Sequence, residues 1–199
     1  GAPPTIIASL ISFPTGQSPP NFFSATHNSG GVVKVSDQVP GDVIPAATVT
    51  VNGATASYDG SYQDYFAEIT LNPGASIAIT VKVSGRTYTA TGQQFSAYPT
   101  ITAPTPGTTW TTDATNLVSW SMASPPSSSQ FLSGLLNAGT GDFVWPADGF
   151  LSIDNAQRNY TIGGGALSVG DRWVFVGIAG QATFAGASTD SGLLIVGFN

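Results

Sequence analysis

The single histidine and the single glutamate are the residues from which an acid–base mechanism would start. His27 is the only imidazole in the chain and Glu68 the only glutamate. A Ser–His–acid hydrolase needs a histidine as its base, and a glycosidase needs two carboxyl groups around one bond. The chain has no G-x-S-x-G sequence that would form a nucleophile elbow. We interpret His27 as an exposed loop residue and Glu68 as a solvent-facing strand residue, and we expect no enzyme activity.

The sequence contains few side chains that could bind a metal ion or a cofactor. Without cysteine and with one histidine, the chain offers transition metals little beyond oxygen ligands. Asp59 with Asp64, or Asp148 with Asp154, could supply oxygens to calcium, but their spacing is not that of an EF-hand. Asp and Gly are also ordinary turn formers, and Gly163-Gly164-Gly165 lacks the lysine of a phosphate-binding loop. We therefore predict turns at these positions, with no metal and no cofactor.

The tryptophans are the remaining candidates for ligand-binding residues. Carbohydrate-binding modules stack sugars on exposed aromatic rings. Trp120 alternates with serines and Trp173 lies in an apolar run, so both are predicted to be buried. Trp110 and Trp145 adjoin turn residues and are predicted to be exposed. They are the candidate carbohydrate-binding residues of an alternative interpretation, in which the chain is a glycan-binding or adhesive module.

Composition narrows the class of protein. Among 199 residues, 5 Lys+Arg stand against 11 Asp+Glu, giving a formal net charge of −6, and only 8% are charged. The sequence holds no basic cluster to neutralise phosphates, so no nucleic-acid partner is expected. The longest apolar run, 192–198, is too short to span a bilayer, so no membrane span is expected. Low charge with abundant Ser and Thr favours a secreted, extracellular or cell-surface protein, of which this would be the mature form.

Strand patterns dominate the chain. Between Thr48 and Thr91 apolar residues alternate with polar ones, and the Asn52-Gly53 pair is typical of a type I′ hairpin turn. This stretch predicts a meander with one solvent-exposed face and one buried face. Further strands are expected in the second half, at 117–121, 131–136, 142–145, 150–153, 159–162, 172–178, 182–185 and 193–198. The Pro-rich run 97–107 predicts a semi-rigid connector, which divides the chain into domains 1–99 and 100–199.

Several motifs resemble those of bacterial immunoglobulin-like modules of exported proteins. The first is Val49-Thr50-Val51-Asn52-Gly53, followed by the turn Asn72-Pro73-Gly74. The second is Pro104, Gly107 and Trp110 ahead of the strand Val118-Ser119-Trp120. The resemblance spans residues 45–122 and implies an all-β chain of two tandem immunoglobulin-like β-sandwich domains. It implies an architecture and no activity, because sandwich folds serve unrelated functions.

The first and last strands are apolar on both faces, unlike the central hairpins. Such strands must be covered on both sides, either inside their own domain or by another copy of the chain. Terminal strands of a sandwich are usually edges, and edges are normally blunted by charge or proline. We therefore expect a non-enzymatic structural protein that assembles by β-strand addition into a fibre, sheath or surface layer, as a homo-oligomer or filament. The predicted self-association residues are Ile6, Ile7, Leu10, Ile11, Phe13, Leu193, Leu194, Ile195, Val196 and Phe198.

Overall fold

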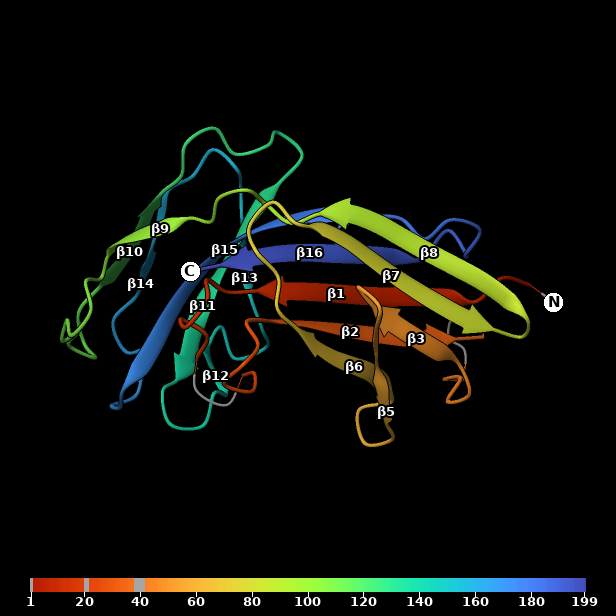
Figure 1. The fold of residues 1–199 in the computed structure, drawn as a ribbon. Helices are drawn as coiled ribbons and strands as arrows, with labels where there is room; N and C mark the ends of the chain where they lie inside the picture. The colour runs from red at the N-terminus through yellow and green to blue at the C-terminus, as the bar shows by residue number, and fades with distance from the viewer. Residues whose placement is uncertain (1, 20–21, 38–41) are drawn as a thin grey trace.

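The chain folds entirely as β-structure. The structure is a computed structural model that describes residues 2–19, 22–37 and 42–199, and this part of the chain contains no helix (Figure 1). The all-β prediction is confirmed. The strands are β1 Thr5–Ser12, β2 Ser29–Ser36, β3 Thr48–Val51, β4 Ala54–Thr55, β5 Ser57–Asp59, β6 Asp64–Ile69, β7 Ser76–Val83, β8 Arg86–Gln93, β9 Thr100–Ala103, β10 Asn116–Ser121, β11 Gln130–Asn137, β12 Phe143–Trp145, β13 Leu151–Ile153, β14 Asn159–Ile162, β15 Arg172–Ala182 and β16 Gly192–Phe198.

These strands form one long sheet and two smaller ones. Sheet A has nine strands in the order β12-β11-β15-β16-β1-β2-β6-β5, with β13 paired to β11 off this path. Sheet B has the order β4-β3-β7-β8, and sheet C has the order β14-β10-β9. Figure 1 shows sheet B at the right and sheet C at the left of the long sheet.

Sheets B and C cover the same face of sheet A. Ile195 of β16 belongs to the core under sheet B, and Ile178 of β15 belongs to the core under sheet C. Ile195 pairs directly with Gly180, two residues after Ile178, so all three residues share one face of sheet A. The fold is thus a sandwich in which one layer is continuous and the other is divided.

The terminal strands lie in the middle of sheet A, which corrects the expectation that they are open edges. Strand β1 pairs in parallel with β16, from Ile7 opposite Gly192 to Ser12 opposite Gly197. Its other edge pairs antiparallel with β2, and the other edge of β16 pairs with β15. Of the two arrangements that the sequence left open, the structure shows the one inside the chain's own fold. Within the described residues, both edges of β1 from Ile7 to Ser12 and both edges of β16 are paired inside the chain.

Burial of the predicted self-association residues follows from this central position. Seven of them are buried within the chain: Ile6, Leu10, Phe13, Leu193, Ile195, Val196 and Phe198. Ile11 and Leu194 are half-buried, and Ile7 alone is exposed, at 58%. The two apolar faces of the terminal strands are covered by different partners. One face meets sheet B, and the other meets a cluster that includes Phe13, Phe175 and Phe198.

The predicted boundary at residue 99 does not coincide with a break between sheets. Strands from both sides of it pair within sheet A. The start of the connector and the residues just before it pack onto that sheet: a Cβ added to Gly180 would lie 3.1 Å from the Phe95 ring, and one added to Gly197 would lie 2.3 Å from the Tyr98 ring. Gln94 is buried beside them and donates through Nε2 to Ser12 Oγ at 2.9 Å. Glycines in β15 and β16 therefore let the connector lie against the shared layer.

The hairpin predictions hold locally but the single meander is wrong. Val49 and Val51 are buried, and Asn52 and Gly53 have φ of 47° and 82°, as a type I′ turn requires. Strand β6, however, pairs with β2 in sheet A and not with β7. The chain therefore crosses from sheet B to sheet A and back between residues 55 and 76. Strands that follow one another in the sequence therefore belong to different sheets, which pack against each other around one core.

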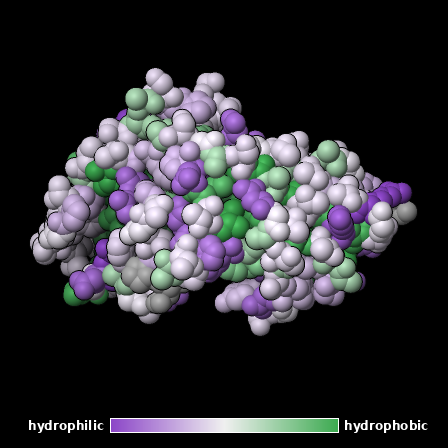
Figure 2. All heavy atoms as spheres, viewed as in Figure 1, coloured by the Kyte–Doolittle hydropathy of each residue, from purple (hydrophilic) through white to green (hydrophobic). Residues whose placement is uncertain are grey.

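Figure 2 shows the surface in the orientation of Figure 1, with hydrophilic residues scattered among pale ones and hydrophobic residues reaching the surface near the middle. Within the described residues, no helix is long and apolar enough to cross a membrane.

Candidate functional site

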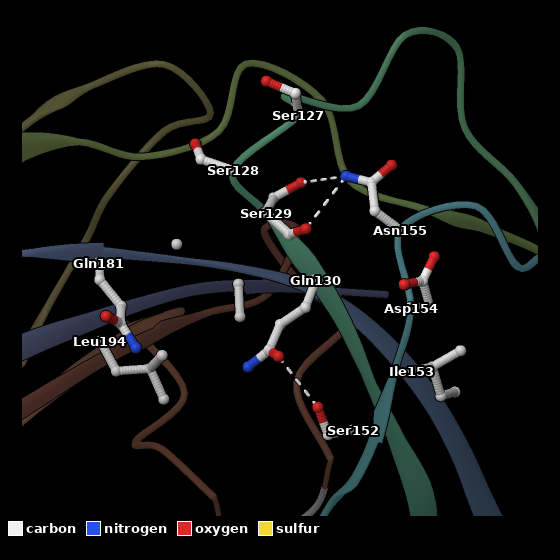
Figure 3. A pocket seen from close by; sticks show the side chains of 12 residues that line it. Ser127, Ser128, Ser129, Gln130, Ser152, Ile153, Asp154, Asn155, Gln181 and Leu194 are labelled. Atoms are coloured by element: carbon white, nitrogen blue, oxygen red, sulfur yellow. Dashed lines mark hydrogen bonds between the residues drawn. The ribbon is translucent and has the colours of Figure 1, made fainter.

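A hollow on the outer face of sheet A is the first candidate site. Its volume is about 570 Å³, within the range of small-molecule sites. We call it the serine hollow. Its lining residues are Ser127, Ser128, Ser129, Gln130, Ser152, Ile153, Asp154, Asn155, Ala179, Gly180, Gln181 and Leu194 (Figure 3).

Strand register brings the floor of this hollow together. Gln130 of β11 pairs with Ala179 of β15, and Gln181 of β15 pairs with Leu194 of β16. Leu194 adjoins Ile195, whose side chain lies under sheet B, so alternation points Leu194 away from sheet B. The hollow therefore opens on the face of sheet A that neither smaller sheet covers.

Hydrogen bonds fix the rim. Asn155 Nδ2 donates to Ser129 O at 3.1 Å and to Ser129 Oγ at 2.9 Å (Figure 3). It also donates to Pro126 O at 2.7 Å. Asp154 Oδ1 accepts from the backbone N–H of Ala156 at 2.8 Å. The turn after β13 is thereby tied to the loop before β11. A ligand would meet a rim that is already in place.

Several polar groups in the serine hollow could form further hydrogen bonds. In the described part of the chain, the side chains of Ser127, Ser128 and Gln181 make no hydrogen bond, and all three are exposed. Gln130 Oε1 accepts from Ser152 Oγ at 3.0 Å, which leaves its amide N–H groups to donate elsewhere. Among the residues that the structure describes, Asp154 is the one charged residue in the lining. Neutral donors and acceptors around the half-buried Leu194 suit an uncharged polar ligand.

The tryptophans predicted to bind carbohydrate lie outside this hollow. Trp145 stacks on Tyr160 with ring centroids 5.4 Å apart and an interplanar angle of 12°, so one of its faces is already covered. Trp110 is half-buried against the core under sheet C. Trp120 is buried as predicted, whereas the prediction of burial is wrong for Trp173, which is 39% exposed.

The second candidate site brings together His27 and Glu68, which lie far apart in the sequence. His27 Nδ1 lies 2.8 Å from Ser24 Oγ and 3.4 Å from Glu68 Oε2. The hydroxyl of Ser24 donates to the same Glu68 oxygen, and the backbone N–H of Ser24 donates to it at 3.1 Å. Pairing of β2 with β6 places the turn at 24–27 beside Glu68. The prediction that His27 is merely an exposed loop residue missed this contact, because pairing between distant strands leaves no local signal.

The geometry of this cluster is not that of a hydrolase triad. In a triad the serine and the carboxylate bind opposite nitrogens of the imidazole. Here both lie at Nδ1, and the hydroxyl of Ser24 donates to Glu68 directly. The same turn is held by Thr70, whose Oγ1 donates to Thr26 O at 3.1 Å. The cluster anchors the turn to strand β6.

The Glu68 carboxylate gives this anchor a pH dependence. The Ser24 hydroxyl and then the Ser24 backbone N–H and His27 hold the pKa of Glu68 below its ordinary value, against a smaller opposing effect of burial. A carboxyl with a lower pKa in the folded state stabilises the fold at pH values above its unfolded-state pKa. That contribution is lost as the pH falls through the folded-state pKa.

We predict that Glu68→Gln lowers stability at pH 7 by about 1 kcal/mol, because a charge-assisted bond at a partly exposed site is lost. Urea unfolding should show the difference from the parent chain narrowing at an acidic pH below the folded-state pKa of Glu68, because the carboxyl of the parent is then protonated as well. Ser24→Ala should remove most of the same pH-dependent part. A Glu68→Gln deficit of equal size at both pH values would contradict this assignment.

Of the aspartates considered as calcium ligands, Asp59 and Asp154 accept hydrogen bonds within turns, and Asp64 is the first residue of β6. Asp59 Oδ1 accepts from the backbone N–H of Ser61 at 2.7 Å, and Asp154 makes the equivalent bond described above. Across residues 2–19, 22–37 and 42–199, no group of three or more His, Cys, Asp or Glu side chains is placed to hold a metal ion.

The chain matches no protein-family model and no curated protein sequence. The serine hollow thus has to be judged from its own geometry. Two of its residues were predicted to have other roles: Leu194 in self-association and Asp154 as a possible calcium ligand. Serines in loops and glutamines on strands are too common to mark a site, and only the register of β11, β15 and β16 gathers them.

Proposed function

We propose that this chain is a non-enzymatic binding module of an exported surface protein, and that its serine hollow binds neutral carbohydrate. The observation that carries the proposal is a hollow of about 570 Å³ in which exposed hydroxyl and amide groups surround the half-buried side chain of Leu194. A sugar ring presents hydroxyls at its edge and C–H groups on its face. The amides of Gln130 and Gln181 would meet the first, and the half-buried side chain of Leu194 the second.

Charge favours a neutral ligand over an acidic or basic one. Asp154 disfavours anions, and the lining contains no Lys or Arg to pair with a carboxylate or phosphate. A cation would find one carboxylate where calcium sites use several oxygen ligands. An uncharged polyhydroxyl ligand uses the serines and amides without burying an unpaired charge.

Export and an immunoglobulin-like ancestry belong to the same proposal. The low proportion of charged residues and the V-T-V-N-G and Pro-Gly turn motifs support them. The antiparallel hairpin β7–β8 and the buried Trp120 of β10 agree with sandwich layers of this kind. The sharing of sheet A between the halves of the chain argues against two separable modules.

Assembly through strand addition has little support in this geometry. The edge strands β4, β5, β9, β12 and β14 have 2 to 4 residues each, and short edges resist pairing with another chain. The longer edge strand β8 is partly covered, since Ala185 N–H donates to Thr89 O at 3.1 Å. The chain is therefore proposed to act as a monomer that binds, and not as a fibre subunit joined by its terminal strands.

The proposal is tested by screening the purified chain against an array of neutral and charged oligosaccharides. We expect binding to neutral ones only, and a loss of about tenfold or more in the Gln130→Ala/Gln181→Ala variant, since each lost hydrogen bond is worth about 1 kcal/mol. Gln17→Ala, an exposed glutamine outside the hollow, should bind like the parent. Binding that the double variant leaves unchanged would refute the site, and no binding to any neutral oligosaccharide would refute the function.

A further inference from the structure

A second hollow, shallow and widely open to solvent, lies on sheet B. Its volume is about 760 Å³. We call it the threonine hollow. Its lining residues are Asn52, Ser76, Ile77, Ala78, Thr91, Gly92 and Gln93.

Register and alternation build this hollow from strands β7 and β8. Ser76 pairs with Gln93, and Ala78 pairs with Thr91. Tyr88 and Ala90 of β8 are buried in the core, so alternation directs Thr91 and Gln93 outward. The wall is thus a row of small and polar side chains on the outer face of sheet B.

The polar groups of the threonine hollow resemble those of the serine hollow in kind. Ser76, Thr91 and Gln93 are exposed, and their side chains make no hydrogen bond within the described residues. Asn52 is held in place: its Nδ2 donates to Ser76 O at 3.0 Å, and its Oδ1 accepts from Ala78 N–H at 2.7 Å. In the described part of the chain, no charged residue lines the hollow. Its chemistry again selects a neutral polar ligand with a small apolar face.

The two hollows open on opposite sides of the molecule. The side chain of Leu194 points away from sheet B, and the serine hollow lies on that side of sheet A. The outward residues of β8 point away from sheet A, because their buried neighbours Tyr88 and Ala90 pack in the core between the two sheets. A single extended polymer chain lying on one side cannot reach both hollows.

We propose that the threonine hollow is a second site for neutral carbohydrate and that the chain cross-links two polysaccharide chains. This inference rests on the proposed function of the serine hollow. Two sites on one side would strengthen binding to a single polymer by effective concentration. Sites on opposite sides instead join separate polymers, which is the role expected of a module in an extracellular matrix.

The stoichiometry of binding tests this inference. Calorimetry of the full chain with cellohexaose, xylohexaose and mannohexaose identifies the hexasaccharide that binds. With that probe we expect two sites per chain for the parent, one for Thr91→Ala/Gln93→Ala and one for Gln130→Ala/Gln181→Ala. Thr87→Ala, on the same face of β8 but outside the hollow, should keep both. Far-ultraviolet circular dichroism of each variant checks that it is folded.

Cross-linking has its own readout. Mixed with the soluble polymer of the sugar that binds, the parent chain should raise light scattering, and either double variant should bind the polymer without raising it. One site per chain, lost only in the Gln130→Ala/Gln181→Ala variant, would overturn the second site and leave the proposed function standing. Binding of none of the hexasaccharides would overturn both.

Discussion

Phe198→Ala should lower the free energy of unfolding by about 3–5 kcal/mol, the cost of truncating a buried phenylalanine. Phe198 is 1% exposed and stacks on Phe13 with centroids 5.4 Å apart. It also meets Phe175 edge-on at 5.2 Å. Removal of its ring leaves a cavity in the cluster that covers the outer face of β15, β16 and β1. Urea unfolding followed by tryptophan fluorescence measures the change.

The matched control is Ile7→Thr, which changes another residue predicted to mediate self-association. Ile7 is 58% exposed and Thr keeps the β-branched shape, so the change should stay within about 0.5 kcal/mol. A stable Phe198→Ala chain that has merely lost the ability to assemble would contradict the interior placement of β16 and restore the fibre interpretation.

Gly197→Ala should destabilise the chain by about 2–3 kcal/mol, since small-to-large changes in packed cores force side chains out of position. The added Cβ would lie 2.3 Å from Tyr98 Cε1 and 2.4 Å from Tyr98 Cδ1. The connector after β8 would have to leave the surface of β16 to make room. Thermal and urea unfolding both report the loss.

Gly192 provides the control within the same strand. A Cβ there would have only Ala182 O within 4 Å, at 3.9 Å, and Gly192→Ala should be neutral or slightly stabilising. Combining Gly197→Ala with Tyr98→Ala should cost less than the sum of the single changes, because the clash is removed with the ring. Additive costs would show that Tyr98 does not lie on Gly197.

Local features of the fold were predictable from sequence because they depend on short-range pattern. Alternation located β3, β7 and β8 with their buried residues, and the Asn52-Gly53 pair located the turn between β3 and β4. The apolar residues on both faces of the terminal strands correctly indicated that each face must pack against other parts of a protein. What covers them could not be read locally, because β1 and β16 meet across nearly the whole chain.

The candidate sites were less predictable for the same reason. The anchor of Ser24, His27 and Glu68 depends on the pairing of β2 with β6, and the serine hollow depends on the register of three strands. Trp145 was predicted to be open because it precedes a proline, but Tyr160 stacks on it. The polarity of a short segment predicts whether its side chains are exposed to solvent. It does not predict which exposed side chains from distant segments come together to form a site.

The central claim is that the terminal strands complete sheet A within a single molecule. Amide hydrogen exchange on the dilute, monomeric chain tests it most directly, because hydrogen-bonded central strands open only with the global fold. The account predicts that the paired amides of Thr5–Ser12 and Gly192–Phe198 exchange among the slowest in the protein, at a rate independent of protein concentration. Rapid exchange in these two strands that slows only when the concentration is raised would contradict it.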